Sequence, residues 1–171
     1  MKGIVGVLLA LVLLGLAAWY FFASSESSSP AEMTEAEIAQ IEAEVNQVLD
    51  EAWAVWSAGE DFDRFMTFFS DDPEVLWISD AVPHFGRDQI DSDFRPVMES
   101  FQRQDNTPVE WRTIVIAPDV VYTVRINDCF QIDLEGNRGP TVRYAETIVW
   151  VKRDGEWKVL IGHGSTPNES M

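Results

Sequence analysis

The chain is poor in the residues that build covalent and metal-binding sites. Its 171 residues include one cysteine, Cys129, so no intrachain disulfide can form. The two histidines, His84 and His163, lie far apart, and neither belongs to a His-x-His or His-x-x-x-His pair. No Gly-rich phosphate loop or nucleophile elbow is present either. We therefore expect no metal and no cofactor.

Positive charge is also scarce. The chain has 12 lysines and arginines against 29 aspartates and glutamates, which gives a net charge of -17. Nucleic acid is excluded as an expected partner, because surfaces that bind nucleic acid are basic. A negative surface of this kind is typical of a protein kept soluble by charge, and it carries no catalytic information.

Charge of either sign is missing from residues 3–23, a run of 21 residues. This is about the length of a helix that crosses a bilayer, and the aromatic residues at 19–22 are typical of the interface. We expect residues 1–23 to be an uncleaved transmembrane anchor, with a secretory signal cut after Ser25 as the alternative. Lys2 precedes the run, which places the domain outside the cytoplasm: periplasmic, or secreted if the segment is cleaved.

The rest of the chain divides into a linker and one domain. Residues 24–33 are rich in serine and predict a flexible linker. Residues 34–168 are enough for one domain with a single core. Cys129 within it is expected to be a small buried hydrophobe.

Two helices are predicted at the start of the domain. Thr34 and Glu37 form a capping box, and Gly59 is suited to end the helix in the left-handed conformation. Between them, apolar residues recur at helical spacing: Ile38, Ile41, Val45, Val48, Ala52 and Val55. A second, shorter helix follows from the spacing of Phe62, Phe65, Met66 and Phe69.

Strands dominate the remainder. Residues 74–79 predict a short strand, and longer strands are expected over 109–117, 120–133 and 141–153. Asp154-Gly155 then supplies the positive φ values of a tight hairpin, since β-rich runs flank it on both sides over 146–165. Helices followed by antiparallel strands predict an α+β fold.

The hairpin segment 146–165 resembles the closing strands of the association domain of calcium/calmodulin-dependent protein kinase II and its SnoaL-like relatives. These belong to the nuclear transport factor 2-like superfamily. Residues 86–90, Gly-Arg-Asp-Gln-Ile, resemble the start of the third helix in SnoaL-like domains, and Pro96 is expected to kink or split that helix. The resemblance covers about residues 34–167 and implies a cone, in which a curved antiparallel sheet wraps three helices. It does not name a function, because the superfamily includes isomerases, dehydratases, ligand binders and assembly modules.

The open end of such a cone predicts a ligand pocket. Its apolar wall is expected from Trp53, Trp56, Trp77 and Trp150, although aromatic residues at these positions also suit a plain core. Arg125 stands in the middle of an apolar strand, and the resemblance implies that it lines the pocket and can hold a carboxylate. The alternatives for Arg125 are an ion pair with Glu146 or a place on the outer sheet face.

Two other arginines of the family pocket are replaced here, by Ile148 and Gly164. The anionic ligands of the family are therefore doubtful for this chain.

Five residues are candidates for moving a proton: Asp80, His84, Tyr144, Glu146 and His163. A two-residue Asp154-Gly155 loop pairs His163 with Glu146, which would create a Tyr-Glu-His cluster. A three-residue loop pairs His163 with Ala145 and leaves Glu146 on the other face, near Arg125; the resemblance favours this register. His84 follows a proline and is expected in a loop near the pocket mouth, within reach of Asp80.

We therefore expect a membrane-tethered, extracytoplasmic domain that binds a small, partly apolar molecule. An isomerase- or dehydratase-type enzyme and a ligand-free assembly module are the alternatives. A homodimer is expected because the last hairpin has apolar residues on both faces, Ile148 and Trp150 on one, Val149 and Val151 on the other.

Overall fold

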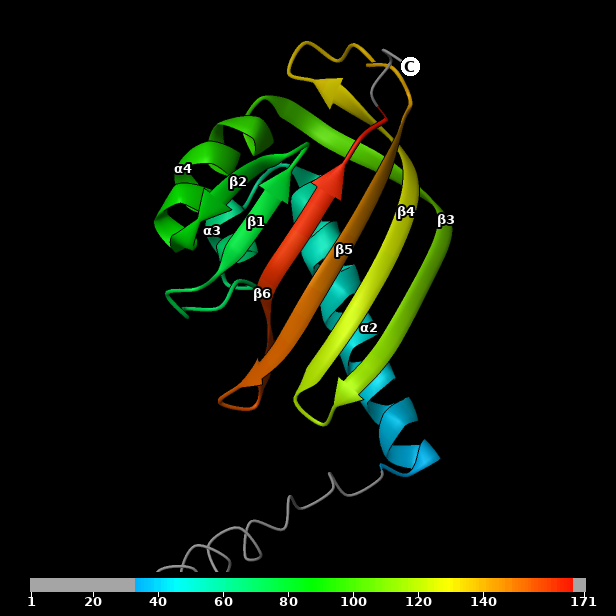
Figure 1. Cartoon of the computed structure of the whole chain (residues 1–171). Helices are drawn as coiled ribbons and strands as arrows, with labels where there is room; N and C mark the ends of the chain where they lie inside the picture. The colour runs from blue at the N-terminus through cyan, green and yellow to red at the C-terminus, as the bar shows by residue number, and fades with distance from the viewer. Residues whose placement is uncertain (1–32, 168–171) are drawn as a thin grey trace, which may run out of the picture. The chain divides into compact units, whose positions relative to one another are not determined.

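A computed structural model describes residues 33–167 (Figure 1). The predicted anchor and nearly all of the linker lie outside the described residues. Within residues 33–167, no helix is both long enough and apolar enough to cross a membrane.

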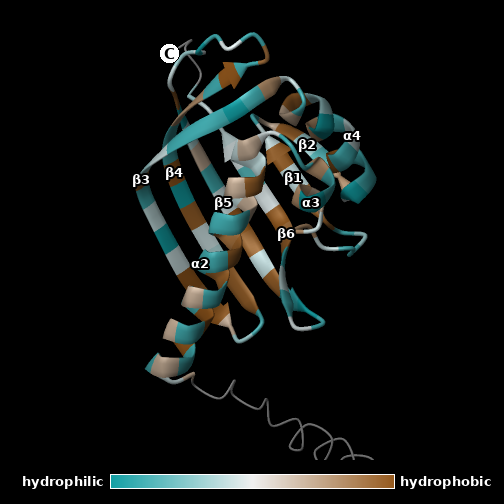
Figure 2. Ribbon diagram, turned by 180° about the vertical axis from the view of Figure 1, so that it is seen from behind, coloured by the Kyte–Doolittle hydropathy of each residue, from teal (hydrophilic) through white to brown (hydrophobic). Residues whose placement is uncertain are grey.

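The first helix of the domain, α2 (Glu35–Ala58), begins and ends where its capping residues predict. The Glu37 N–H donates to Thr34 Oγ1 at 3.2 Å, and the Thr34 N–H donates to Glu37 Oε2 at 2.8 Å. Gly59 ends the helix with φ 70°. Helix α2 lies across the inner face of the sheet (Figure 2), and four side chains on it are buried: Val45, Leu49, Ala52 and Val55.

Two further helices pack beside it, α3 (Phe62–Met66) and α4 (Gly86–Met98). Pro96 lies in the last turn of α4, and the helix ends two residues later. The predicted three helices of the domain are therefore confirmed.

Six strands form one curved sheet in the order β2-β1-β6-β5-β4-β3. They are β1 (Leu76–Ser79), β2 (Val82–Phe85), β3 (Phe101–Ala117), β4 (Val120–Asp133), β5 (Val142–Arg153) and β6 (Glu156–Ser165). All neighbouring pairs are antiparallel except β1 and β6, which run parallel. The α+β cone is confirmed, whereas the purely antiparallel sheet is corrected by this one pair.

Strand β2 replaces the loop predicted around His84. Pro83 suggested a loop because proline cannot donate to a neighbouring strand. The strand lies at the edge of the sheet, where a missing donor is tolerated, and its one neighbour is β1. His84 is therefore a buried strand residue, 8% exposed.

The hairpin between β5 and β6 follows neither predicted register at His163. Arg153 and Glu156 flank a two-residue loop, the alternative that the resemblance did not favour, and Asp154 and Gly155 have φ values of 52° and 87°. A bulge after the Trp150–Val159 pair then shifts the register by one residue, so that His163 pairs with Thr147. Glu146 pairs with Gly164 instead, which places it on the face opposite to His163. The Tyr-Glu-His cluster does not form.

Two glycines on the inner face of β6 leave room for aromatic rings. A Cβ at Gly162 would lie 2.1 Å from Trp77 Cε3, and one at Gly164 would lie 1.8 Å from the Tyr144 hydroxyl. The space that a side chain would take at these positions is therefore filled from neighbouring strands. Trp150, fully buried, donates its indole N–H to Thr123 Oγ1 at 2.9 Å and fills the centre of the core.

Candidate ligand-binding cleft

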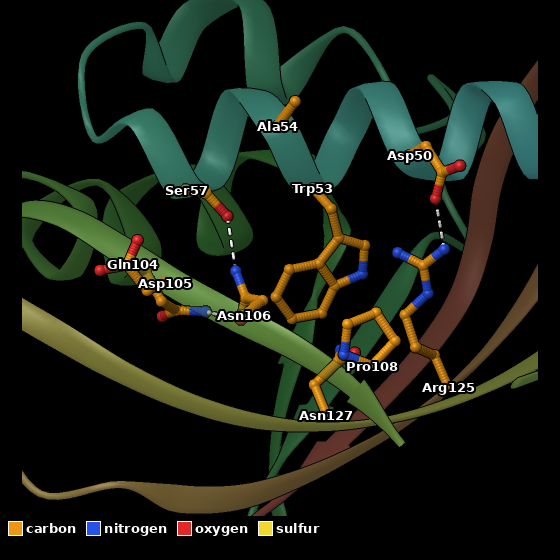
Figure 3. A pocket seen from close by; sticks show the side chains of 10 residues that line it. All are labelled: Asp50, Trp53, Ala54, Ser57, Gln104, Asp105, Asn106, Pro108, Arg125 and Asn127. Carbon is orange, nitrogen blue, oxygen red and sulfur yellow. Dashed lines mark hydrogen bonds and ion pairs between the residues drawn. The ribbon is translucent and has the colours of Figure 1, made fainter. Parts of the chain in front are cut away.

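A cleft of about 300 Å³ lies between α2 and the strands β3 and β4 (Figure 3). Ten residues line it: Asp50, Trp53, Ala54 and Ser57 from α2, Gln104, Asp105, Asn106 and Pro108 from β3, and Arg125 and Asn127 from β4. The α2 residues follow helical spacing and so share one face, and the two β4 residues are two positions apart and share the inner face of the sheet. The cleft is thus built from three elements that are distant in sequence.

Arg125 lies on the inner face of β4, which rules out the outer face considered for it. Its side chain is 15% exposed and its guanidinium donates to the Asp50 carboxylate, which is 70% exposed. Glu146 is its direct neighbour on β5, yet the ion pair is made with Asp50. Asp50 as the partner was not predicted from sequence.

Asn127 forms a buried part of the cleft wall. It is 1% exposed, and among the described residues its Nδ2 finds no hydrogen-bond partner. A buried amide without a partner is unfavourable by about 1–3 kcal/mol. The cleft therefore contains a donor that lacks an acceptor.

The opposite wall is a chain of amides and hydroxyls that satisfy one another. Gln104 Nε2 donates to Asn106 Oδ1 at 2.9 Å, and Asn106 Nδ2 donates to Ser57 Oγ at 2.7 Å. The Trp56 indole N–H donates to Gln104 Oε1 at 3.4 Å. This network fixes the shape of that wall.

Trp53 separates the cleft from a buried acidic group. Its indole N–H donates to Glu146 Oε1 at 2.5 Å, and Glu146 is only 4% exposed. Burial raises the pKa of Glu146 to about 7, although the Trp53 hydrogen bond and the charge of Arg125 act in the opposite direction. Glu146 therefore titrates near neutral pH.

Tyr144 packs edge-on against Trp53, with ring centroids 6.0 Å apart. Burial, together with the negative charges of Glu146 and Asp80, holds the pKa of Tyr144 well above its usual range. Tyr144 therefore stays protonated at physiological pH. Tyr144 and Glu146 lie behind Trp53, and neither is among the ten residues that line the cleft.

The tryptophans expected in the wall have different places. Trp53 lines the cleft. Trp77 and Trp150 are core residues, 7% and 0% exposed, because strands β1 and β5 turn them toward the helices. Trp56 packs among Phe65, Phe94 and Phe101 and reaches the site only through its bond to Gln104.

The remaining candidates for proton transfer lie elsewhere. His84 Nδ1 bonds to Asp93 Oδ2 at 2.7 Å, and its Nε2 is buried without a partner among the described residues. Asp80, expected beside His84, instead accepts from the Thr166 N–H at 2.8 Å in the turn after β1. His163 lies on the outer face of the sheet. None of the three lines the cleft.

Several cleft residues were not predicted: Ser57, Gln104, Asn106 and Asn127. One signal was present for Asn127, which follows Arg125 by two residues in the same strand. No comparable signal identifies Gln104 and Asn106, because the strand was expected to begin at residue 109, whereas β3 begins at Phe101. In residues 33–167 no group of three His, Cys, Asp or Glu side chains could hold a metal ion.

Comparison with known proteins agrees with this architecture. The chain matches the SnoaL-like domain family over residues 45–169, and no curated protein matches it. A solved structure of a proposed dehydratase of the nuclear transport factor 2-like family from Streptomyces avermitilis is similar, with a TM-score of 0.67 and 12% identity, over 76% of this chain and 98% of that one. A proposed calcium/calmodulin-dependent protein kinase II association domain from Xanthomonas campestris has a TM-score of 0.64 and 18% identity, over 83% and 94% of the two chains.

A proposed scytalone dehydratase from Novosphingobium aromaticivorans has a TM-score of 0.65 and 11% identity, over 80% of this chain and 89% of that one. At such identities the structures share a fold and need not share an activity. The family model, in contrast, spans most of the domain. The chain therefore belongs to the SnoaL-like domain family, and it shares its fold with a structure of the nuclear transport factor 2-like family.

Proposed function

We propose that this domain binds a small, partly apolar molecule in the cleft between α2, β3 and β4, with Arg125 as a polar contact. The observation that carries this proposal is the placement of Arg125, largely buried, in a cleft beside the ring of Trp53. A volume of about 300 Å³ is at the lower end of the range for small-molecule sites. The partner of Arg125, Asp50, is well exposed, so the ion pair lies open on its Asp50 side to a polar group of a ligand.

The position of the ionisable groups supports binding over proton transfer. An isomerase or dehydratase would bring an acid or base to the bound molecule. Here the candidates are dispersed, and the one with a pKa near 7, Glu146, is separated from the cleft by Trp53. An assembly module would need no cleft at all.

Arg125→Leu is expected to abolish binding of a ligand identified by thermal-shift screening, while the fold stays intact. The reason is that the change removes a largely buried charge and leaves behind only the Asp50 carboxylate, which is exposed to water. Calorimetric titration and urea unfolding measure the two effects. Asp50→Asn is the matched control, since it removes the partner and keeps the guanidinium in the cleft.

A different result would show that Arg125 forms its ion pair with Glu146. In that case Arg125→Leu would lower the free energy of unfolding by about 3 kcal/mol at pH 8, and it would lower it by less in a Glu146→Gln background. Unchanged stability together with unchanged affinity would remove Arg125 from the site.

We also propose that the domain is tethered to the membrane by residues 1–23, with the domain outside the cytoplasm. Support comes from the uncharged run of residues 3–23. Fractionation of cells that express the full chain is expected to place it in the membrane pellet, resistant to high salt. Recovery of a soluble protein whose N-terminus lies near Glu26 would show a cleaved signal instead.

A homodimer is the third part of the proposal. One row of apolar side chains crosses the outer face of four neighbouring strands: Ile114, Tyr122, Val149 and Ile161, each paired with the next. Ile114 and Ile161, at the two ends of the row, are 49% and 40% exposed, so no part of the described domain covers these apolar side chains. Val151, expected on this face, is 3% exposed and cannot contribute.

Val149→Arg is expected to convert a dimer of the fragment 31–171 into a monomer, because it places a charge at the centre of the row. Light scattering at high micromolar concentration gives the mass. Val82→Arg is the control, since Val82 is 56% exposed on strand β2, outside the row. A fragment that is monomeric before any substitution would refute the dimer.

A further inference from the structure

We infer that the cleft takes an uncharged, polyhydroxylated ligand, a saccharide, and this inference rests on the binding function proposed above. Its basis is the hydrogen bonding and the charge of the lining residues. Together they favour a ligand that donates and accepts hydrogen bonds and has no net charge.

The first step concerns charge. Both carboxylates of the cleft already have cationic partners, Asp50 with Arg125 and Asp105 with Arg103. Arg125 in turn is the one cation among the ten lining residues. An anionic ligand would find no uncommitted cation, in a chain whose net charge is -17. A cationic ligand would have to lie beside the buried guanidinium of Arg125.

The second step concerns hydrogen bonds. The Asn127 amide is a buried donor that lacks an acceptor, while Arg125 offers donors and Asp50 offers acceptors. A hydroxyl group accepts one hydrogen bond and donates another, so neighbouring hydroxyls can insert at the Arg125–Asp50 pair and also reach Asn127. Arg125 and Asn127 are two residues apart on one face of β4, roughly 6.5–7 Å along the strand. The two donors therefore belong to separate side chains on one face, an arrangement that suits two hydroxyl groups of one ligand.

The third step concerns the apolar side of the ligand. Trp53 projects from α2 into the cleft between the amide wall and Arg125 (Figure 3). Its indole N–H is held by Glu146, which fixes the orientation of the ring before any ligand arrives. An indole surface is apolar and suits the C–H groups of a sugar ring. The site thus has one fixed aromatic ring, and amides, a hydroxyl and an ion pair surround that ring. It suits a molecule that is polar at its edge and apolar on its face.

The test is a titration of the full chain in a detergent without a sugar headgroup, followed by ¹⁵N NMR. The Trp53 indole signal is assigned with Trp53→Phe, and the Asn127 side-chain amide with Asn127→Leu. The probes are glucose, galactose, mannose, N-acetylglucosamine and the disaccharides maltose and cellobiose, with butyrate and glycine as charged comparisons. At least one saccharide is expected to shift both signals saturably. Tighter binding of a disaccharide than of a monosaccharide would indicate that the natural ligand is part of a glycan chain. Equal binding would indicate a free sugar.

Asn127→Leu is expected to weaken that saccharide at least about tenfold, the factor that corresponds to one lost hydrogen bond. Asn46→Leu is the matched control: Asn46 lies earlier on α2, bonds to Thr113 and does not line the cleft. If Asn127→Leu does not fold, Arg125→Leu provides the same comparison. Binding of butyrate or glycine with no response to any saccharide would overturn the ligand class and leave the binding function standing. No response to any of the probes would overturn both.

Discussion

The free energy of unfolding is expected to fall by about 3 kcal/mol between pH 4.5 and pH 7 because of Glu146. Replacing Glu146 with glutamine is expected to abolish this fall. The pKa of Glu146 is about 7 in the fold, against 4.5 for an unperturbed glutamate. Between these values the folded chain holds the proton and the unfolded chain releases it, so the stabilising contribution is complete below pH 4.5 and is lost as the pH rises through 7. A difference of about 2.5 pH units corresponds to about 3 kcal/mol.

The measurement is urea unfolding at pH 5, 6, 7 and 8 for the parent protein and for Glu146→Gln. The variant is expected to match its parent at pH 5 and to exceed it at pH 8, because an amide oxygen can still accept the Trp53 hydrogen bond without a buried charge. Comparison at the same pH cancels the contribution of the histidines.

Glu44→Gln is the control for this experiment. Hydrogen bonds from Lys152 and Trp157 lower the pKa of Glu44 to about 2, so its titration lies below the window. The control should leave the pH dependence above 4.5 unchanged. If Glu146→Gln and its parent lose stability equally between pH 5 and pH 8, Glu146 is charged throughout that range.

Gly162→Ala is expected to lower the free energy of unfolding by about 3 kcal/mol, at the upper end of the range for overpacked cores. The added Cβ would lie 2.1 Å from Trp77 Cε3. The Trp77 ring cannot move aside freely, because it packs edge-on against Phe69 and Phe94, with centroids 5.9 Å away in both cases. Urea unfolding of the parent and the variant gives the difference.

Two comparisons show whether the Trp77 ring is the cause. Gly139→Ala should have little effect, because the nearest atom to its Cβ is Gln131 O at 3.4 Å, an ordinary contact. In a Trp77→Leu background the effect of Gly162→Ala should shrink, since the smaller side chain leaves room for the methyl group. An equal loss in both backgrounds would place the strain in the backbone of β6.

Features that depend on neighbouring residues were predictable from the sequence. The capping box of Thr34 and Glu37, the left-handed Gly59 and the positive φ values of the Asp154-Gly155 turn all appear as expected. Each is set by side chains and φ preferences within a few residues. The family resemblance supplied the start of α4 at Gly86, and Arg125 was recognised because a charged residue in an apolar strand needs a partner.

Long-range pairing was decided by the tertiary structure. The parallel contact of β1 with β6 joins the first strand to the last, and no local pattern encodes it. The bulge between β5 and β6 placed His163 outside the core, in a register that neither of the two predicted loop lengths gives. A one-residue shift turns a side chain to the other face, so a single bulge changed the set of residues that can meet.

The sequence by itself determined the fold class, the order of the helices and long strands, and the presence of a mid-strand arginine that faces a partner. Only the tertiary structure decided which partner that is, because Asp50 on α2 and Arg125 on β4 are joined by the crossing of the helix over the sheet. The same crossing gathers Ser57, Asn106 and Asn127 into one cleft and leaves Glu146 behind Trp53. Contacts of this kind depend on packing across the whole domain, whereas spacing along the chain reports only which face each side chain takes.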